Sequence, residues 1–218
     1  MRISLPMRPS LCLLLLLIVS LAAHASPPQE PSTLCDQAIR NGEATGHTPP
    51  GMLAAIGQVE SGRIDPGTGG MRPWPWTIDA DGVGQFFATK AQAVAAVAAL
   101  QSRGVRSVDV GCMQINLMYH PDAFASLDQA FDPASNTAYA TRFLNVLYRR
   151  MGSWSKAIAA YHSETSRIGE DYQRRVLMTW QQHVTATVVS GPTYIDRGLI
   201  YGAFGSTGRV YGQFLPGQ

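Results

Sequence analysis

The sequence predicts an α+β domain that is mainly helical, with one small antiparallel β-sheet inserted between helices. Three observations support this prediction. Apolar segments that begin with capping residues and end at glycine are typical of helices, and they occupy most of the chain. Turn residues between two short extended segments predict a β-hairpin in residues 74–87. The helices and strands are segregated along the chain, which favours α+β over α/β.

The helix that matters most for function begins after Thr48-Pro49-Pro50, because a hydroxyl cap followed by proline is typical of a helix start. Apolar residues at positions 52, 53, 56 and 59 continue this helix, and Gly62 is expected to end it. Glu60 therefore falls in its last turn. The other helices are predicted at residues 34–43, 91–103, 133–151, 153–162 and 170–183, with a short amphipathic segment at 122–131.

The predicted strands lie between the second and third of these helices and directly after the third. Glycines at positions 67, 69 and 70 indicate a loop before the first strand. The hairpin pairs residues 74–78 with residues 83–87 through a turn at Asp79–Gly82. Residues 105–110 form a third expected strand, which leads into Gly111–Asn116.

The N-terminus has the pattern of a secretory signal peptide, predicted to be residues 1–25. Arg2 and Arg8 precede a short apolar core, and Ala23-His24-Ala25 is typical of a cleavage site. The alternative is an uncleaved N-terminal anchor. We expect a protein that is periplasmic or otherwise exported and that meets the membrane only during export. Residues 26–33 are predicted to be a flexible lead-in, residues 34–184 the domain, and residues 185–218 a Gly/Tyr-rich tail that is mobile or loosely attached.

Charge and cysteine content narrow the possibilities further. The net charge of +2 comes from the two leader arginines, so the rest of the chain is neutral and lacks the basic surface of a nucleic-acid binder. Without the leader, which contains Cys12, two cysteines remain, Cys35 and Cys112. In an exported protein such a pair predicts a disulfide, and two buried free thiols are the alternative. The sequence contains no convincing metal-ligand spacing or phosphate-binding loop, so no metal or cofactor is expected.

Glu60 is the candidate for acid–base chemistry. Partial burial and the negative end of a helix dipole both disfavour its charged form, so we expect its pKa to lie above the usual range for glutamate. A carboxyl group that keeps its proton near neutral pH can act as a general acid. The alternative is a solvated glutamate near a helix end. Two other segments, Gly111–Asn116 and Ala160–Ser163, also place polar residues in apolar surroundings.

Together these segments resemble the lysozyme-like lytic transglycosylases of the soluble-lytic-transglycosylase (SLT) domain family. That family has a Glu-Ser pair at a helix end, then Gly-x-Met-Gln-Ile, then an Ala-x-Ala-Tyr-Asn-type helix. The matching residues are Glu60-Ser61, Gly111-Cys112-Met113-Gln114-Ile115 and Ala157-x-Ala159-Ala160-Tyr161-His162. The resemblance covers residues 34–182 and implies a lysozyme-like fold. His162 departs from the commoner asparagine.

The resemblance implies that peptidoglycan strands are the substrate and that Glu60 is the sole catalytic acid and base. It would protonate the oxygen between N-acetylmuramic acid and N-acetylglucosamine, and the muramyl 6-hydroxyl would then form a 1,6-anhydro product. The N-acetyl group would stabilise the intermediate, so a second carboxylate is not needed. Asp79 and Asp81 are expected to be turn formers and Asp109 a strand-end residue, although a second acid of a lysozyme would come from this sheet.

The expected substrate-binding residues each have a structural alternative. Ser61 would bond Glu60 or the sugar, or else a backbone carbonyl. Gln114 and Asn116 would bind N-acetyl and hydroxyl groups, or else brace the junction of sheet and helix. Met113 would line the floor under the acetyl group, or else pack in the core. The remaining two are Tyr161, otherwise a core aromatic, and His162, otherwise a satisfied helix histidine.

The interval between Ser61 and Gly111 is long for this family, and it contains Trp74 and Trp76. Their rings could stack on sugars or pack the hairpin. Two other functions stay open: a hydrolysing muramidase of the same fold, and a non-catalytic peptidoglycan-binding assembly scaffold. General wall turnover and service to a secretion, conjugation or motility machine are equally compatible with the sequence.

Overall fold

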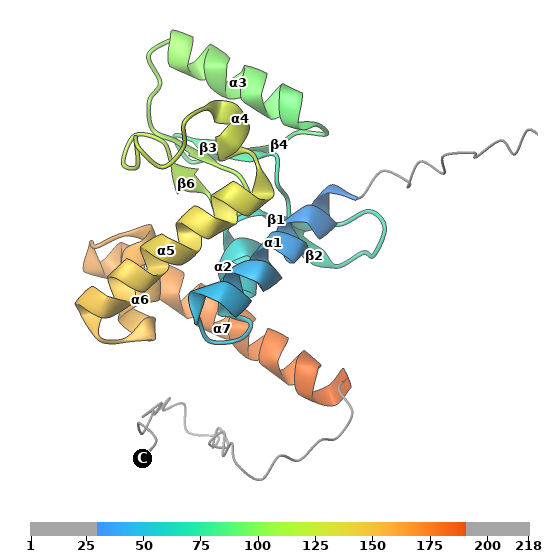
Figure 1. Cartoon of the computed structure of the whole chain (residues 1–218), viewed down its shortest axis with the longest axis vertical. Helices are drawn as coiled ribbons and strands as arrows, with labels where there is room; N and C mark the ends of the chain where they lie inside the picture. Colours follow the sequence, from blue (N-terminus) through green and yellow to red (C-terminus); the bar gives the residue numbers. More distant parts are fainter. Residues whose placement is uncertain (1–29, 191–218) are drawn as a thin grey trace, which may run out of the picture.

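The computed structural model describes residues 30–190, and in this part of the chain helices surround short antiparallel strands (Figure 1). The helices are α1 (Pro31–Gly46), α2 (Met52–Ser61), α3 (Lys90–Ser102), α4 (Leu127–Ala130), α5 (Pro133–Met151), α6 (Trp154–His162) and α7 (Ser166–Ser190). The strands are β1 (Gly62–Ile64), β2 (Met71–Pro73), β3 (Thr77–Ala80), β4 (Val83–Phe86), β5 (Val108–Val110) and β6 (Ile115–Asn116). The predicted α+β architecture is confirmed.

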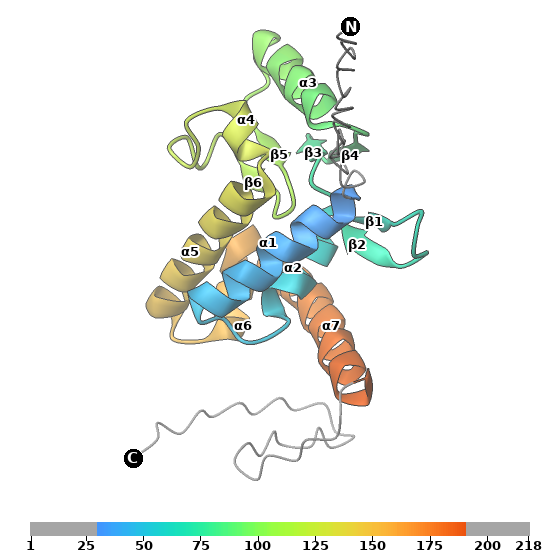
Figure 2. The same ribbon diagram turned by 45° about the vertical axis from the view of Figure 1, so that its right-hand side comes forward.

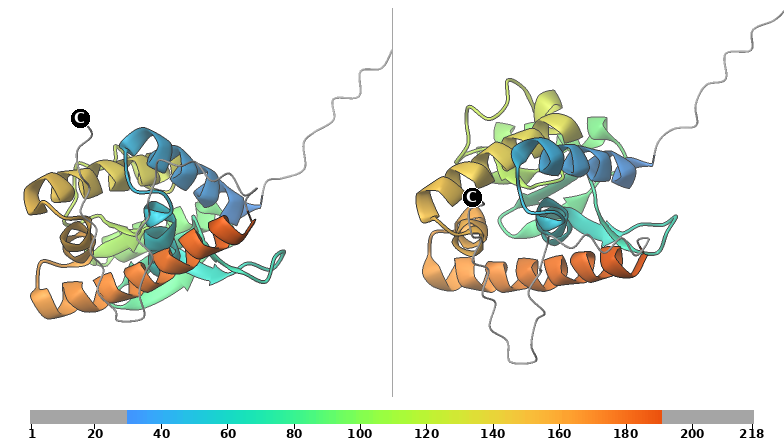
Figure 3. Two further views of the ribbon diagram at one scale, coloured as in Figure 1. Left: turned by 90° about the horizontal axis from the view of Figure 1, so that it is seen from below. Right: turned by 60° about the horizontal axis from the view of Figure 1, so that its bottom comes forward.

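Helix α2 is the centre of the helical part. Its residues Met52, Leu53 and Ile56 are fully buried. It lies between α1 and α5 on one side and α7 on the other (Figure 3). Gly57 allows the close approach of α1, because a Cβ atom there would stand 2.9 Å from Cδ1 of Ile39.

The start of α2 differs from the prediction. The helix begins at Met52, after Gly51 in a left-handed conformation, and Thr48 does not cap it. Instead, the Glu43 carboxylate of α1 accepts hydrogen bonds from the backbone N–H groups of Gly51 (3.0 Å) and Ala54 (3.2 Å). A carboxylate at a helix N-terminus accepts hydrogen bonds from the free N–H groups and interacts favourably with the positive end of the helix dipole. A tertiary contact therefore replaces the expected local cap.

Helix α7 packs against the other side of α2 (Figure 3). Nε1 of Trp180 donates to the Pro50 carbonyl at 2.8 Å, just before α2 begins. Nε2 of His183 lies 2.9 Å from Oε1 of Gln58 near the other end of α2. Helix α7 therefore contacts both ends of α2.

The main sheet has the strand order β4-β3-β5-β6, all antiparallel, and it lies with α3 at one end of the molecule (Figures 1 and 2). The β3–β4 hairpin turns at Asp81-Gly82, so the predicted hairpin is confirmed, although its first strand begins at Thr77 and not at Trp74.

A second, two-stranded sheet was not predicted. Strands β1 and β2 pair on either side of the glycine-containing loop, where Asp65 accepts hydrogen bonds from the N–H groups of Gly67 and Thr68. The sequence signals for this loop were clear. The strands are too short to show an alternating pattern.

The predicted disulfide between Cys35 and Cys112 is present, with a Cα–Cα distance of 5.8 Å. Both residues are fully buried. The bridge joins α1 to the segment between β5 and β6, across 77 positions of sequence.

Two boundaries differ from the prediction. Helix α1 begins at Pro31, so the last three residues of the predicted lead-in are helical. Helix α7 begins at Ser166 and extends to Ser190, the last described residue, past the expected boundary at residue 184. The predicted leader, residues 26–29 and the tail from 191 lie outside the described residues. Within residues 30–190, no helix combines the length and hydrophobicity that crossing a membrane requires.

Replacing both cysteines by serine should lower the free energy of unfolding by about 2–4 kcal/mol, because the bridge closes a long loop in the unfolded chain. Urea titration of parent and Cys35→Ser/Cys112→Ser proteins measures this difference. Adding reductant should destabilise the parent but leave the double variant unchanged. Equal unfolding midpoints for the two oxidised proteins would contradict the prediction.

Candidate functional site

Glu60 is half-buried in the last turn of α2, and its surroundings strongly favour the protonated form. Burial raises its pKa from 4.5 to about 8, and repulsion from Asp109 and Asp79 adds to this effect. The Tyr172 hydroxyl and the Arg175 guanidinium act in the opposite direction. The expected upward pKa shift is therefore confirmed, and its largest cause is the removal of the carboxyl from water.

The Ser61 hydroxyl forms no hydrogen bond with Glu60 and does not face solvent. Its side chain is 1% exposed, and its hydroxyl donates to the carbonyls of Cys112 (2.7 Å) and Gly57 (3.2 Å). The same oxygen accepts from the Trp74 N–H at 3.3 Å. The expectation of a bond to Glu60 or the sugar is wrong, and the backbone alternative is confirmed. Ser61 joins the end of α2 to the chain around Cys112.

The segment from Gly111 to Asn116 is held by a buried asparagine of α5. Asn136 is 0% exposed, accepts from the Met113 N–H at 2.9 Å, and donates to the carbonyls of Val110 (2.9 Å) and Ala130 (3.0 Å). A Cβ atom on Gly111 would stand 2.4 Å from Nδ2 of Asn136, so only glycine fits there, with φ at +84°. The sequence did not identify Asn136, because nothing in it separates this residue from other polar residues of an amphipathic helix.

Met113 is fully buried in the main core. Its side chain therefore cannot form the floor of a sugar site, and the core alternative is confirmed. Gln114 has a positive φ of 45°, and its Nε2 donates to the carbonyls of Thr77 (3.1 Å) and Gly111 (3.0 Å). Nδ2 of Asn116 donates to Oγ of Ser107 at 3.0 Å. Both amides brace the sheet, which was the structural alternative for these two residues. Their binding of N-acetyl groups stays a prediction.

Tyr161 comes from α6 and supports the same segment. Its hydroxyl donates to the Met113 carbonyl at 2.8 Å and not to Glu60. Burial, repulsion from Glu60 and repulsion from Asp109 raise its pKa well above 10, so it stays a neutral donor. His162 is exposed and stacks on the ring of Tyr172, with centroids 4.6 Å apart. Its contact with substrate stays a prediction.

Tyr172 of α7 is a site residue that the sequence placed only within the helix predicted at residues 170–183. It is 1% exposed, and its hydroxyl faces Glu60 closely enough for each group to shift the pKa of the other. This buried hydroxyl forms no hydrogen bond of normal geometry within residues 30–190, and Glu60 is the side chain with which it interacts. Arg175, one turn further along α7, places its guanidinium 5.6 Å from the centre of the Tyr172 ring.

Three polar residues form a row across the main sheet. Asp79 of β3 lies opposite Asp109 of β5, which lies opposite Asn116 of β6. Burial and repulsion from Asp79 raise the pKa of Asp109 to about 6, although Asn116 lowers it. Oδ1 of Asp79 accepts from the Gly82 N–H at 2.9 Å, as expected of a turn former. Asp109 lies in the middle of its strand and not at the end.

The prediction that the two tryptophans stack on sugars has a different outcome for each residue. Trp74 is 6% exposed, its Nε1 donates to the Phe87 carbonyl at 2.7 Å, and the guanidinium of Arg63 stands 4.1 Å from the centre of its ring. Since no open ring face remains for a sugar, the stacking prediction is wrong for Trp74. Trp76 is half-buried and packs with its edge against Trp74, at a centroid distance of 5.9 Å. Its stacking on sugar stays a prediction.

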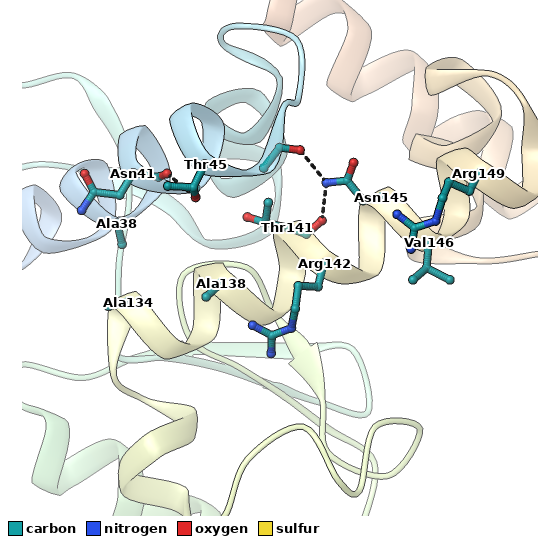
Figure 4. A pocket seen from close by; sticks show the side chains of 12 residues that line it. Ala38, Asn41, Thr45, Ala134, Ala138, Thr141, Arg142, Asn145, Val146 and Arg149 are labelled. Carbon is teal, nitrogen blue, oxygen red and sulfur yellow. Dashed lines mark hydrogen bonds between the residues drawn. The ribbon is translucent and has the colours of Figure 1, made fainter.

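A groove of about 560 Å³ lies elsewhere, between α1 and α5 (Figure 4). Small residues such as Ala38 and Ala138 line it, together with Arg142 and Arg149. It contains none of the residues around Glu60. Among the described residues, His, Cys, Asp and Glu side chains form no group of three that could hold a metal ion.

Comparison with protein families finds a match to the transglycosylase SLT domain over residues 37–176. The matched region extends from α1 to the middle of α7 and includes every residue discussed around Glu60. Comparisons with curated proteins and with solved structures find no match.

The raised pKa of Glu60 predicts a pH-dependent cost to folding. Its folded-state pKa of about 8 exceeds the unfolded value of 4.5, so stability is lost as pH rises between these two values. Glu60→Gln removes the titration. We expect this variant to match the parent near pH 4 and to exceed it at pH 8 by roughly 1–3 kcal/mol, which discounts the full shift because Glu60 is partly exposed.

Urea unfolding of both proteins at pH 4, 6 and 8 measures this difference. Other titrating groups are common to the two proteins and cancel in the comparison. A difference that does not change with pH would show that Glu60 has an ordinary pKa.

Proposed function

Because the chain belongs to the transglycosylase SLT domain family, we propose that it is an exported peptidoglycan lytic transglycosylase in which Glu60 is the single acid and base. Family membership supports lytic-transglycosylase activity on peptidoglycan. The choice of Glu60 as the catalytic group, the anhydro product and the export of the protein are our inferences.

The observation that carries the proposal is the state of Glu60. A carboxyl with a pKa of about 8 is mostly protonated at neutral pH, so it can donate a proton to the oxygen of a glycosidic bond. Glu60 also lies in the last turn of a buried helix, and the hydroxyl of the next residue, Ser61, donates to two backbone carbonyls. A proton donor held in this way needs little reorganisation before reaction.

In the proposed reaction, the Glu60 carboxyl protonates the oxygen that links N-acetylmuramic acid to C4 of N-acetylglucosamine. The bond from the muramyl C1 to this oxygen breaks, and the N-acetyl carbonyl oxygen bonds C1 to give a cyclic cation. The Glu60 carboxylate then takes the proton of the muramyl 6-hydroxyl while that oxygen displaces the acetyl oxygen at C1. The product is a 1,6-anhydro sugar, and Glu60 regains its proton.

Export is proposed from the leader pattern at residues 1–25 and fits the disulfide. The Cys35–Cys112 bridge is of the kind that persists in oxidising compartments, such as the bacterial periplasm. Peptidoglycan strands are accessible in that compartment.

A hydrolytic muramidase is a second candidate, and one observation favours it. Asp79 and Asp109 lie on a sheet near Glu60, and a second carboxylate could activate water for attack on C1. The two reactions give different products from the same bond.

Mass spectrometry of digested peptidoglycan should detect anhydro-muropeptides with the parent protein. Glu60→Gln should lower the rate by at least about 100-fold, because the amide cannot donate a proton to the bridging oxygen. Glu164→Gln, an exposed carboxylate paired with Arg150, is the matched control and should keep parental activity. Products that contain only reducing-end muramic acid would contradict the transglycosylase and support the muramidase.

The rate should also fall as pH rises through about 8, since the protonated form of Glu60 is the active acid. The pH dependence of kcat/KM between pH 5 and 10 measures this limb. A rate that stays constant up to pH 10, or that already falls between pH 5 and pH 7, would be inconsistent with Glu60 as the acid.

A further inference from the structure

We infer that Arg63 is a binding site for a carboxylate of the peptidoglycan strand. Arg63 lies in β1, and its guanidinium stands over the rings of Trp74 and Phe86. The carboxylate belongs either to the lactyl group of muramic acid or to the stem peptide that the lactyl group carries. This inference rests on the proposed function and deepens it, because it assigns a residue that recognises the negative charge of the strand. Arg63 takes no part in breaking the bond.

Chain connectivity and hydrogen bonds place Arg63 near Glu60. Strand β1 follows α2 directly, so Arg63 comes three residues after Glu60, and three residues span at most about 11 Å. The ring of Trp74, which the guanidinium contacts, is attached to the same helix end, because the Trp74 N–H donates to the Ser61 carbonyl at 3.0 Å. A glycan strand bound at Glu60 can therefore extend to Arg63.

Two aromatic rings hold the Arg63 guanidinium in place. Its central carbon lies 4.1 Å from the centre of the Trp74 ring and 5.7 Å from the centre of the Phe86 ring. Both distances are within the range of cation–π interactions. The ring face of Trp74 that is closed to sugar is thus the face that supports Arg63. A side chain that is already ordered loses less conformational entropy when it binds a ligand.

Phe86 shows which face of the main sheet Arg63 covers. Phe86 lies opposite Thr77 of β3, and side chains alternate along a strand, so Phe86 and Asp79 share one face. Ile78 points from the other face into the core that α3 covers. The Arg63 guanidinium therefore lies on the face that carries Asp79, away from this core.

Arg63 carries a positive charge that no described acid neutralises. In the β1–β2 pair it lies directly opposite Arg72, and like charges in such a position are destabilising. Asp36 of α1 forms an ion pair with Arg72. Within residues 30–190, no carboxylate forms an ion pair with Arg63, and its contacts are with the two rings. An anionic ligand would supply the counter-ion that this pair of arginines lacks.

A carboxylate matches the chemistry of this position. A guanidinium presents its N–H donors in a planar fork that fits the two oxygens of a carboxylate. The sugar rings of peptidoglycan are neutral, so the negative charge of the strand lies on its lactyl groups and stem peptides. Neutral aromatic rings orient Arg63 without removing its charge, so the guanidinium stays available for this contact.

The kinetic test is Arg63→Gln, with Arg103→Gln as its matched control. Arg103 is exposed at the end of α3, which lies away from β1 and β2, so its variant should keep parental activity (Figures 1 and 2). On soluble glycan strands, Arg63→Gln should raise KM by at least about 10-fold and leave kcat within about 3-fold, because a contact made equally in ground and transition states is lost. Arg63→Lys keeps the charge but not the fork, so its KM should lie between those of the parent and Arg63→Gln.

Binding of ligands that differ only in charge separates recognition from a structural role. Calorimetry uses Glu60→Gln proteins with and without Arg63→Gln, so that the ligand is not cleaved. Arg63→Gln should weaken binding by at least about 10-fold for strands that end their lactyl groups in carboxylates, for strands that carry stem peptides, or for both. A loss with the peptide-free strand assigns the lactyl carboxylate, and a loss confined to the other strand assigns the peptide.

Two neutral ligands serve as references in the same experiment. An N-acetylglucosamine oligosaccharide of equal length, and the peptide-free strand with its lactyl carboxyls converted to amides, should bind within about 3-fold in the presence and absence of Arg63. If the lactyl carboxylate is the ligand, the protein with Arg63 intact should also bind the amidated strand at least about 10-fold more weakly than the charged strand. This last comparison does not require the variant to fold.

Unchanged affinity of Arg63→Gln for every ligand would overturn this inference. Equal losses for neutral and charged ligands would also overturn it, because they would show that Arg63 only holds the hairpin against β1. The activity of Glu60→Gln alone tests the proposed function separately. An active Glu60→Gln, combined with selective loss of charged ligands in Arg63→Gln, would overturn the role of Glu60 and leave the carboxylate site standing.

Discussion

The arrangement of this site depends on how the end of α2 is attached to the segment between β5 and β6. One hydroxyl, that of Ser61, donates to the carbonyl of Cys112 at 2.7 Å while also bonding its own helix. Cys112 is in turn bonded to Cys35 of α1, and the neighbouring Met113 N–H is held by Asn136 of α5. Helices from three parts of the chain thereby fix one short loop, and Glu60 is adjacent to it.

The chemistry of Glu60 follows from its position at the boundary between the helical and sheet parts of the molecule. On one side α7 contributes Tyr172 and Arg175, which favour the ionised form, and on the other side Asp79 and Asp109 oppose it. Burial outweighs the favourable contacts. The net result is a carboxyl that holds its proton near neutral pH.

Sequence patterns were sufficient for the α+β architecture, the disulfide and the position of Glu60, because these depend on apolar periodicity, on glycines that end helices and on cysteine count. They were not sufficient for the roles of the surrounding polar residues. Ser61, Gln114 and Asn116 were correctly singled out as unusual, yet in the structure they satisfy backbone and side-chain groups. A pattern shows that a polar residue is buried but not where its hydrogen bonds go. Asn136 and Tyr172 were missed because each occupies an ordinary position of an amphipathic helix.

The late position of α7 in the chain has a consequence for the order in which this domain is completed. The disulfide joins residues 35 and 112, so it can close before α5, α6 and α7 have been made or exported. Glu60, in contrast, lies in the last turn of α2, which packs against α7, more than one hundred positions further along. A chain can therefore be crosslinked while the side of α2 that later packs against α7 is still open to water. Under the proposed function, Glu60 would therefore become a proton donor only after α7 has packed against α2.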